Sequence, residues 1–259
     1  MKLASFNING IKARLEALTA WLAEAQPDVV VLQEIKSVDE GFPRAAFEAM
    51  GYQVETHGQK AFNGVAILSK LPLTDIQRGL PGDDADEQAR WIEAVVQGPR
   101  PLRVCGLYLP NGNPAPGPKY DYKLAWMARM EVRVRDLLAS EEAFACLGDY
   151  NVIPQAIDAA KPEAWVTDAL YLPESRASLR RMENLGLTEA IRTLLPGPGV
   201  YTFWDFQAGA WERNNGIRID HVMLSPQAAD RLEGAGIDKT TRGCDKPSDH
   251  VPVWVRPAA

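Results

Sequence analysis

Short apolar blocks separated by polar residues run along the whole chain, and most of them have the length of a β-strand. The block VVVL within residues 28–35 has no polar alternation, which predicts a buried strand. Other blocks of this length lie between Gly, Pro, Asn or Asp residues, which break regular structure. These blocks predict further strands at residues 2–7, 52–56, 64–68, 91–96, 102–109, 143–147, 219–224 and 251–255.

Three segments instead place apolar residues at the spacing of one helix face. In residues 11–25 apolar side chains recur every three or four positions, and Pro27 follows the end of this segment. Residues 120–138 and 177–185 are the clearest later helices. The pattern therefore predicts many strands and few helices.

The order of these elements indicates the architecture. Strands at residues 92–96 and 102–107 are separated by the turn residues GPRP, which predicts a hairpin and an antiparallel pair. Many strands with few helices favour an α/β (α+β) fold of two stacked, mainly antiparallel sheets with helices outside. No repeat or linker divides the chain, and the Pro-rich residues 111–118 are interpreted as a loop, so residues 1–259 are expected to form a single domain.

Composition narrows the class of protein. Of 259 residues, 46% are hydrophobic and 24% are charged, which is ordinary for a soluble globular chain. No apolar run approaches the roughly 20 residues that span a bilayer, and no signal peptide precedes the first strand, so no membrane partner is expected. Cys105, Cys146 and Cys244 contain no C-x-x-C pair, which favours reduced structural thiols in a cytoplasmic protein.

The net charge of −6 disfavours a polyanionic partner at first sight. It results from 28 Lys and Arg against 34 Asp and Glu, and phosphate binding depends on cationic side chains. Carboxylates that hold divalent cations, however, reverse the local field. The formal charge therefore does not exclude a nucleic acid.

Polar side chains recur directly after apolar strands, where a simple core does not require them. Asn7, Glu34 and Tyr108 each follow such a block, and Asp149 and Asn151 follow the block FACLG. Because these positions lie at strand ends, the side chains are expected at an edge of the sheet structure.

Asp220, Asp249 and His250 come just before apolar strands rather than after them. In an antiparallel sheet the end of one strand lies beside the start of its neighbour, so both sets of residues can share one rim. Carboxylates gathered in this way repel one another unless a cation or paired donors lie among them. Oxygen donors, chiefly Glu34 with Asp249 or Asp149, favour Mg²⁺ or Mn²⁺, and no Cys/His cluster has the spacing of a zinc site.

Each of these residues also has a structural explanation when it is taken alone. Asp149 beside Gly148 can form a turn, and Asp220 and Asp249, each next to a histidine, can form surface pairs. Glu34 is harder to explain, because an acid directly after an apolar strand is costly unless it has reached the rim or a partner. Only their joint presence predicts a functional site.

Six motifs extend this pattern over essentially the whole chain. They are FNINGIKAR (residues 6–14), LQEIK (32–36), YLPNG (108–112), GDYN (148–151), WERNNGIRIDHVMLS (211–225) and SDHVP (248–252). In this order they resemble the exonuclease III family of abasic-site endonucleases, within the endonuclease/exonuclease/phosphatase superfamily. The resemblance implies a four-layered αββα sandwich, DNase I-like, with the active site at one rim of the two sheets.

The resemblance also implies a metal centre. Glu34 is expected to be the principal ligand, assisted by Asn7 and Asp249. Asp149, with Asn151 beside it, is expected to activate or orient the attacking water, and both can offer oxygens to the metal. Mg²⁺ or Mn²⁺, as one ion or two, all stay open at this point.

The implied reaction is metal-dependent hydrolysis of a phosphodiester by in-line attack of water, which leaves a 3′-hydroxyl and a 5′-phosphate. His250, paired with Asp220, is expected to face the scissile phosphate, where its protonated form stabilises negative charge. The implied catalytic set is Tyr108, Asp149, Asn151, Asp220, Asp249 and His250. How acid and base roles divide among them stays open.

The implied partner is double-stranded DNA with abasic sites or with recessed or blocked 3′ ends. A monomer is expected by default, because nothing in the sequence pattern demands a partner chain. Phosphate contacts are expected in loops flanking the motifs, from Lys12, Arg90, Asn111 and Arg213. A hydrophobic pocket for a flipped abasic sugar is expected from Phe203, Trp211, Ile217 and Ile219. Phe203 and Ile219 are equally well explained as core residues. Some relatives carry Asp at the position of Asn9 and Trp at that of Ile217, which bears on how tightly an abasic sugar is held.

Two other functions fit the same pattern less well. The fold can carry a small-molecule or lipid phosphodiesterase or phosphatase, because fold does not determine substrate. A nucleic-acid-binding protein without catalysis is also conceivable, but every polar position of the motifs is filled. The motifs NNGIRID and YLPNG favour DNA as substrate.

Overall fold

Buried apolar strands from the two ends of the chain form the centre of the first sheet. In the computed structural model, which describes residues 1–258, this sheet has six strands. In spatial order they are β11 (Leu232–Ile237), β12 (Val253–Pro257), β1 (Leu3–Asn7), β2 (Val29–Gln33), β4 (Val65–Ser69) and β3 (Gln53–His57). Only β1 and β2 are parallel, so their ends lie at the same edge.

The second sheet repeats this plan with the middle of the chain. In spatial order its six strands are β5 (Leu73–Arg78), β6 (Trp91–Val96), β7 (Leu102–Tyr108), β8 (Phe144–Asp149), β10 (Asp220–Leu224) and β9 (Thr188–Glu189). The predicted hairpin is β6 and β7, and the one parallel pair is β7 and β8. Both sheets are therefore mainly antiparallel, each with one central parallel pair.

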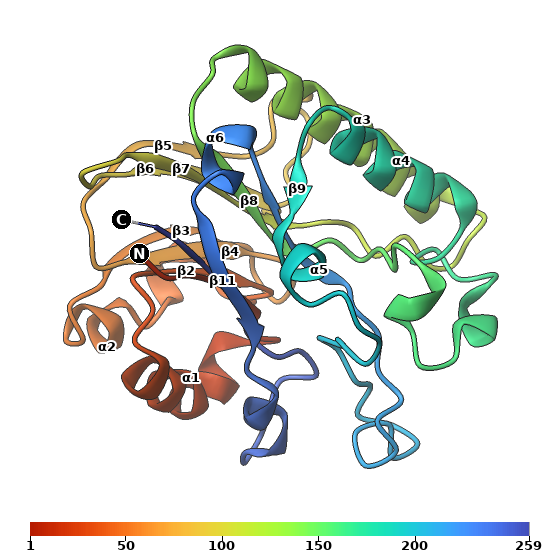
Figure 1. Cartoon of the computed structure of the whole chain (residues 1–259). Helices are drawn as coiled ribbons and strands as arrows, with labels where there is room; N and C mark the ends of the chain where they lie inside the picture. The colour runs from red at the N-terminus through yellow and green to blue at the C-terminus, as the bar shows by residue number, and fades with distance from the viewer. Residues whose placement is uncertain (259) are drawn as a thin grey trace.

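The two sheets pack face to face, with helices on both outer sides (Figure 1). Val31, Ile67, Ile92, Val104 and Leu147 are fully buried in the core between the sheets. The helices α1 (Ile11–Ala25) and α2 (Arg44–Glu48) cover the first sheet, and α3 (Pro118–Ala139) and α4 (Pro173–Asn184) cover the second. The predicted four-layered αββα sandwich is confirmed.

The remaining helical segments are short. They are α5 (Ala190–Leu194), α6 (Pro226–Ala229) and the 3-10 turns η1 (Asp39–Gly41), η2 (Ala156–Asp158), η3 (Pro162–Trp165) and η4 (Lys239–Gly243). No helix within residues 1–258 is long and apolar enough to cross a membrane.

Three strands were not predicted from the sequence, and all three are edge strands: β5, β11 and β9, which at two residues is too short to show a pattern. In β5 four of six side chains are exposed, and β11 has no fully buried side chain. A strand that buries little apolar surface has no period-two pattern, which is why the pattern missed β5 and β11. The helices α3 and α4 also begin earlier than predicted, at Pro118 and Pro173, since proline is well suited to the first turn of a helix.

Strand register brings the polar strand ends together at one rim. Asn7 at the end of β1 is paired with Gln33 at the end of β2, the residue before Glu34. In the second sheet, Tyr108 is in register with Asp149. Asp149 also pairs with Asp220 at the start of the antiparallel β10. The rim thus collects residues from segments that lie far apart in sequence.

Candidate active site

Asn7 connects the two sheets at this rim. Its Nδ2 donates to Glu34 Oε1 at 2.9 Å and to Asp149 Oδ2 at 2.9 Å, so one amide holds a carboxylate from each sheet. Its Oδ1 accepts from the backbone N–H of Asn9 at 3.0 Å. With its oxygen used in this way, Asn7 acts in this structure as an orienting donor between the two acids.

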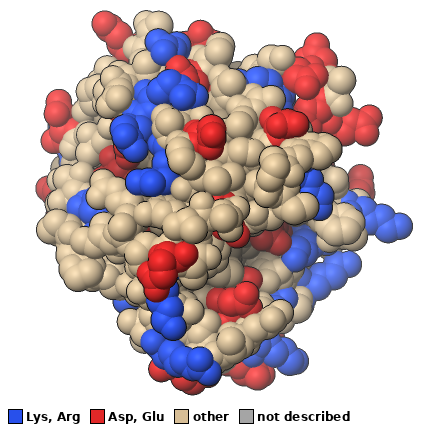
Figure 2. Space-filling model, turned by 90° about the vertical axis from the view of Figure 1, so that its right-hand side faces the viewer, with Lys and Arg blue, Asp and Glu red and all other residues tan. Residues whose placement is uncertain are grey.

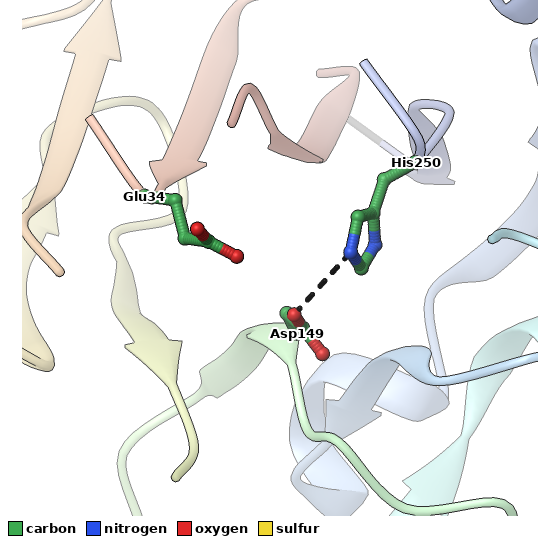
Figure 3. A group of neighbouring side chains, drawn as sticks. All are labelled: Glu34, Asp149 and His250. Atoms are coloured by element: carbon green, nitrogen blue, oxygen red, sulfur yellow. Dashed lines mark ion pairs between the residues drawn. The ribbon is translucent and has the colours of Figure 1, made fainter. Parts of the chain in front are cut away.

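Glu34, Asp149 and His250 surround a common point (Figure 3). One potential ligand atom of each lies within 4.8 Å of the others. His250 Nε2 is 3.6 Å from Asp149 Oδ2, while its Nδ1 is 2.8 Å from Asp220 Oδ2. Two carboxylates with hard oxygen donors can hold a divalent cation here, and the imidazole faces them from the opposite side.

The environments of the two acids shift their pKa values in opposite directions. Burial raises the pKa of Asp149 to about 7, and the charges of Asp220 and Glu34 add to this while His250 opposes it. Burial also acts to raise the pKa of Glu34, but the hydrogen bond from Asn7 and the charge of Lys36 outweigh it and lower the value. Glu34 is therefore ionised and suited to a cation, whereas Asp149 can exchange a proton near neutral pH.

His250 is held as a cation. Burial alone would lower its pKa, but the charges of Asp220 and Asp149 reverse this and raise it to about 10. With Nδ1 bonded to Asp220, the Nε2–H of His250 is directed at the space beside Asp149. The pKa of Tyr108 is raised well above its usual value by burial and by Glu34 and Asp149, so this hydroxyl stays protonated as a donor.

The backbone is strained where the site is built. Asn9, Glu34, Lys36 and Asn151 all have positive φ, at 47°, 48°, 51° and 47°. Residues other than glycine rarely adopt this conformation, and such residues cluster at functional sites. Gly148, next to Asp149, is required for a different reason, since a Cβ there would lie 1.9 Å from the carbonyl oxygen of Leu107.

Asp249 sits at the edge of the group that surrounds the common point. Its Oδ1 accepts from Asn9 Nδ2 at 3.0 Å. Asn9 Oδ1 in turn accepts from Lys36 Nζ at 2.5 Å, and Lys36 forms an ion pair with Glu34 at 3.0 Å. Asn9 and Lys36 thus couple Asp249 to the central carboxylates, a connection that sequence motifs do not reveal.

Asn151 is held from three directions. Its backbone N–H donates to Asp149 Oδ1, its Nδ2 donates to the carbonyl of Leu109, and its Oδ1 accepts from Asn111 Nδ2 at 3.3 Å. The Asn151 carbonyl accepts from the buried Lys123. These contacts place Asn151 and the exposed Asn111 on one continuous network beside Asp149.

Lys123 was missed by the sequence analysis. Although fully buried, its Nζ donates to the carbonyls of Asn111, Asn151 and Ala169, which ties three loops together beneath the site. A signal for it was present, because Lys123 falls at helical spacing among Tyr120 and other buried residues of α3.

The predicted DNA-contact residues fall into two groups. Lys12, Asn111 and Arg213 are exposed. Arg90 is half-buried; its guanidinium stacks over the Tyr108 ring at 4.8 Å and donates to the Tyr108 carbonyl. A cationic group is thus held directly beside the rim. These side chains remain candidates for phosphate contact.

The predicted sugar pocket is only partly at the surface. Phe203 lies edge-on to the His250 ring at 5.0 Å, and Trp211 packs against Trp204. Ile217 and Ile219 are each only 2% exposed and belong to a hydrophobic cluster against which Phe203 packs. Their part in a sugar pocket stays a prediction, and Phe203 and Trp211 keep accessible surface.

The charge distribution agrees with this arrangement. Viewed from the side on which the rim loops lie, the surface has a hollow that contains acidic side chains, with Lys and Arg side chains along its edge (Figure 2). Cationic side chains around an acidic centre suit a polyanion whose phosphate meets a bound cation.

Of the three cysteines, Cys105 and Cys146 are buried and Cys244 is exposed, and all three are free thiols, as predicted.

Comparison with known proteins covers the whole chain. Residues 4–250 match the family model described as the endonuclease/exonuclease/phosphatase family. The chain is 36% identical to exodeoxyribonuclease III of Haemophilus influenzae over 98% of both chains. Among solved structures, a 3′ phosphatase from Neisseria bound to a product DNA hairpin matches with a TM-score of 0.96 and 36% identity, with full coverage of both chains. An AP endonuclease from Archaeoglobus fulgidus matches with a TM-score of 0.95 and 33% identity, again with full coverage.

These relatives are named as an exodeoxyribonuclease, a 3′ phosphatase and an AP endonuclease, and the two solved structures share the fold of this chain. The six motifs and the full-length matches agree with each other. The chain therefore belongs to the endonuclease/exonuclease/phosphatase family and is a hydrolase of the nuclease type.

Proposed function

We propose that this protein is a Mg²⁺-dependent DNA-repair nuclease that cleaves duplex DNA 5′ to abasic sites and trims nucleotides or blocking groups from 3′ ends. It acts as a monomer in the cytoplasm, where its three free thiols stay reduced. The observation that carries the proposal is the opposed pair at the rim: a carboxyl group that can accept a proton at neutral pH, and an imidazolium cation 3.6 Å away.

Asp149 and His250 divide the work around the phosphorus atom. Asp149, with its pKa raised, takes a proton from the attacking water, while Asn7 and the backbone of Asn151 hold the carboxylate in place. His250 donates from Nε2 to a phosphate oxygen as negative charge builds there, and Asp220 keeps the ring charged and oriented.

Tyr108 completes the donor set on the side of the second sheet. Because its pKa is raised, its hydroxyl remains a proton donor toward the phosphate or the leaving 3′ oxygen. Arg90 stacks on its ring and adds positive charge beside it. The products are a 3′-hydroxyl and a 5′-phosphate.

The acids fit a divalent cation. Glu34 is ionised, 18% of its side chain is exposed, and it presents carboxylate oxygens toward Asp149, which is a donor set that Mg²⁺ or Mn²⁺ prefers. When bound, such an ion supplies Lewis-acid stabilisation of charge on the phosphate and the leaving oxygen. Glu34 would be its principal ligand, with Asp149 and Asp249 assisting.

DNA is the substrate class that the surroundings favour. On this side of the molecule the surface has a hollow with acidic side chains inside and cationic side chains along its edge (Figure 2). Related proteins act on DNA, among them the Neisseria 3′ phosphatase solved with a product DNA hairpin. A small-molecule or lipid phosphoester is the rival substrate.

The test is incision of a duplex with one tetrahydrofuran abasic analogue, run beside a recessed 3′ end and an inositol phosphate. We expect EDTA-sensitive cleavage of both DNAs and none of the inositol phosphate. Glu34→Ala and Asp149→Asn should each lower the rate by about 10²–10⁴ with the fold retained. The exposed Asp230 offers a matched control, since Asp230→Asn makes the same chemical change at a side chain that forms no hydrogen bond or ion pair within residues 1–258.

Each outcome decides one part of the proposal. Undiminished cleavage by Glu34→Ala or Asp149→Asn removes that residue from the mechanism. Hydrolysis of the inositol phosphate in preference to both DNAs replaces the DNA substrate with the rival class.

A further inference from the structure

A second cavity lies outside the catalytic rim, between α4 and α5. Its volume is about 630 Å³, which is large enough for a nucleotide-sized group. Its walls include four arginines, and we call it the arginine pocket. It is lined by Arg176, Arg180, Arg192 and Arg218, together with Gln155 and Glu183.

Two of these arginines build the wall of the pocket. Arg218 is 2% exposed and forms ion pairs with Asp158 at 2.7 Å and Glu189 at 2.9 Å. Arg192 pairs with the same Asp158, and its Nε is buried without any partner within the described residues. These ion pairs hold this wall of the pocket in place.

The other two arginines are free to bind an anion. Arg176 and Arg180 are four residues apart on α4, so both point from the same face of the helix. Arg176 donates from Nε to the Pro154 carbonyl and stacks on Tyr171 at 4.5 Å, which leaves both terminal nitrogens available. The side chain of Arg180 forms no hydrogen bond or ion pair with any residue from 1 to 258. Arginine forks of this kind match the geometry of phosphate oxygens.

The acid in the pocket reduces this attraction without cancelling it. Burial raises the pKa of Glu183, the charge of Glu189 adds to the rise, and Arg218 and Arg180 oppose it. Asp158 and Glu189 are already paired with Arg218 and Arg192. The free charge that faces the cavity is therefore Arg176 and Arg180 against Glu183.

The arginine pocket is close to the catalytic rim along the chain. Pro154 and Gln155 line it, and Pro154 is only three residues after Asn151. Three extended residues span at most about 11 Å. The side of the molecule that carries the acidic hollow also has a separate gathering of Lys and Arg side chains (Figure 2). One strand of DNA rises about 3.4 Å per base step, so a backbone held at the rim reaches this distance within a few nucleotides.

We propose that the arginine pocket binds a phosphate group of a nucleotide or nucleic-acid strand, at a site separate from the one where cleavage occurs. The inference rests on the proposed function for its substrate. The phosphate has two sources, a backbone phosphate of the bound DNA beyond the scissile bond, or the 5′-mononucleotide that exonucleolytic cleavage releases.

Binding is measured without divalent cations, so that the catalytic acids do not recruit the ligand. Inorganic phosphate and thymidine 5′-monophosphate are titrated by NMR into the wild-type chain and the double variant Arg176→Gln/Arg180→Gln. The matched control is Arg135→Gln/Arg181→Gln, which removes the same charge from two arginines that both pair with Glu131 outside the pocket. Glu183→Gln removes the opposing acid.

Duplex binding is measured in an Asp149→Asn background, with about ten or only about three base pairs on either side of the abasic analogue. We expect the Arg176/Arg180 variant to lose phosphate binding and to bind the long duplex about fivefold more weakly, with a salt slope lower by about 1. Binding of the short duplexes should be unchanged, and so should their cleavage rates when these are measured with Asp149 intact. Glu183→Gln should tighten phosphate binding.

These measurements distinguish a backbone phosphate from the released mononucleotide, and they test the arginine pocket separately from the proposed function. Loss of phosphate binding together with weaker binding of the long duplex identifies a backbone phosphate. Loss of phosphate and monophosphate binding with the long duplex unaffected identifies the released product. Equal loss in the Arg135/Arg181 control, or phosphate binding that survives in the Arg176/Arg180 variant, overturns the inference. Failure of the wild-type chain to cleave even short abasic duplexes would instead count against the proposed function.

Discussion

The charge on His250 depends on Asp220, and replacing this acid by its isosteric amide tests the proposed electrostatics. Asp220→Asn keeps an oxygen that can accept the Nδ1–H of His250, so the ring orientation should survive while the negative charge is lost. In the metal-free protein we expect the pKa of His250 to fall from about 10 into the range where an ordinary histidine titrates.

The size of this effect follows from the geometry. Two unit charges 2.8 Å apart, the distance from Nδ1 to Asp220 Oδ2, attract by roughly 6 kcal/mol at an effective dielectric constant of about 20. The rise of the His250 pKa from 6.5 to about 10 corresponds to roughly 5 kcal/mol after burial has opposed it. Asp149, 3.6 Å from Nε2, remains in the variant, so we expect a fall of roughly 2 to 3 in the pKa.

Histidine NMR measures this directly. The chain has three histidines, and the pKa of His57 is lowered while that of His221 is lowered to about 4, so neither should titrate near pH 8. The wild-type His250 ring should stay protonated from pH 6 to pH 8.5, and in Asp220→Asn it should titrate inside this range. A wild-type His250 that titrates near 6.5, or an unchanged value in the variant, refutes the reasoning.

The pH dependence of the free energy of unfolding tests the charge on His250 independently. The folded pKa of His250 lies above its unfolded value, so the charged ring stabilises the fold fully below about pH 6.5. This contribution disappears as pH rises through about 10. The loss of unfolding free energy in Asp220→Asn should therefore be largest near pH 6 and should shrink toward pH 10, whereas Asp230→Asn should show no such dependence.

Three further predictions concern the metal, the backbone and the thiols. Mg²⁺ or Mn²⁺ at about 100 times its dissociation constant should add about 2.7 kcal/mol to the free energy of unfolding and raise the Tm by roughly 5–10 °C in calorimetry. A Tm unaffected by either ion argues against a cation site. Gly148→Ala should lower the free energy of unfolding, measured in urea, by about 3 kcal/mol or more, because the new Cβ would lie 1.9 Å from the Leu107 carbonyl oxygen. A variant with near-wild-type stability contradicts this prediction. A thiol reagent should label Cys244 alone in the native chain and all three cysteines in denaturant, since Cys105 and Cys146 are fully buried; fast labelling of a second native thiol would show that the core opens.

Much of the fold was predictable because its central strands bury both faces. A run such as VVVL has the same appearance in any protein that covers both sides of a strand, so β2 was found from its residues alone. The edge strands β5 and β11 were missed because most of their side chains stay partly or fully exposed. Edge strands are recognised by the neighbour that they pair with, which a local pattern does not contain.

The candidate site was predictable at the level of residue identity but not of contact. Polar residues at strand ends pointed to Glu34 and Asp149. Lys123 was missed because a lysine on a helix is ordinarily a surface residue, and only its three carbonyl partners explain its burial. Ile217 and Ile219 were expected in a pocket for the abasic sugar, and only the packing of the chain shows that both are buried in the cluster against which Phe203 packs.

By itself, the sequence determined where the central strands end and which polar side chains stand at those ends, because apolar runs and the glycines and prolines between them are local properties. Tertiary structure alone decided which of these side chains meet. The amide that joins the two sheets bonds across 142 residues, and the charge on each acid and on the imidazole depends on burial and on distances of a few ångström. Those distances arise from strand register, and register is a relation between segments that no single segment encodes.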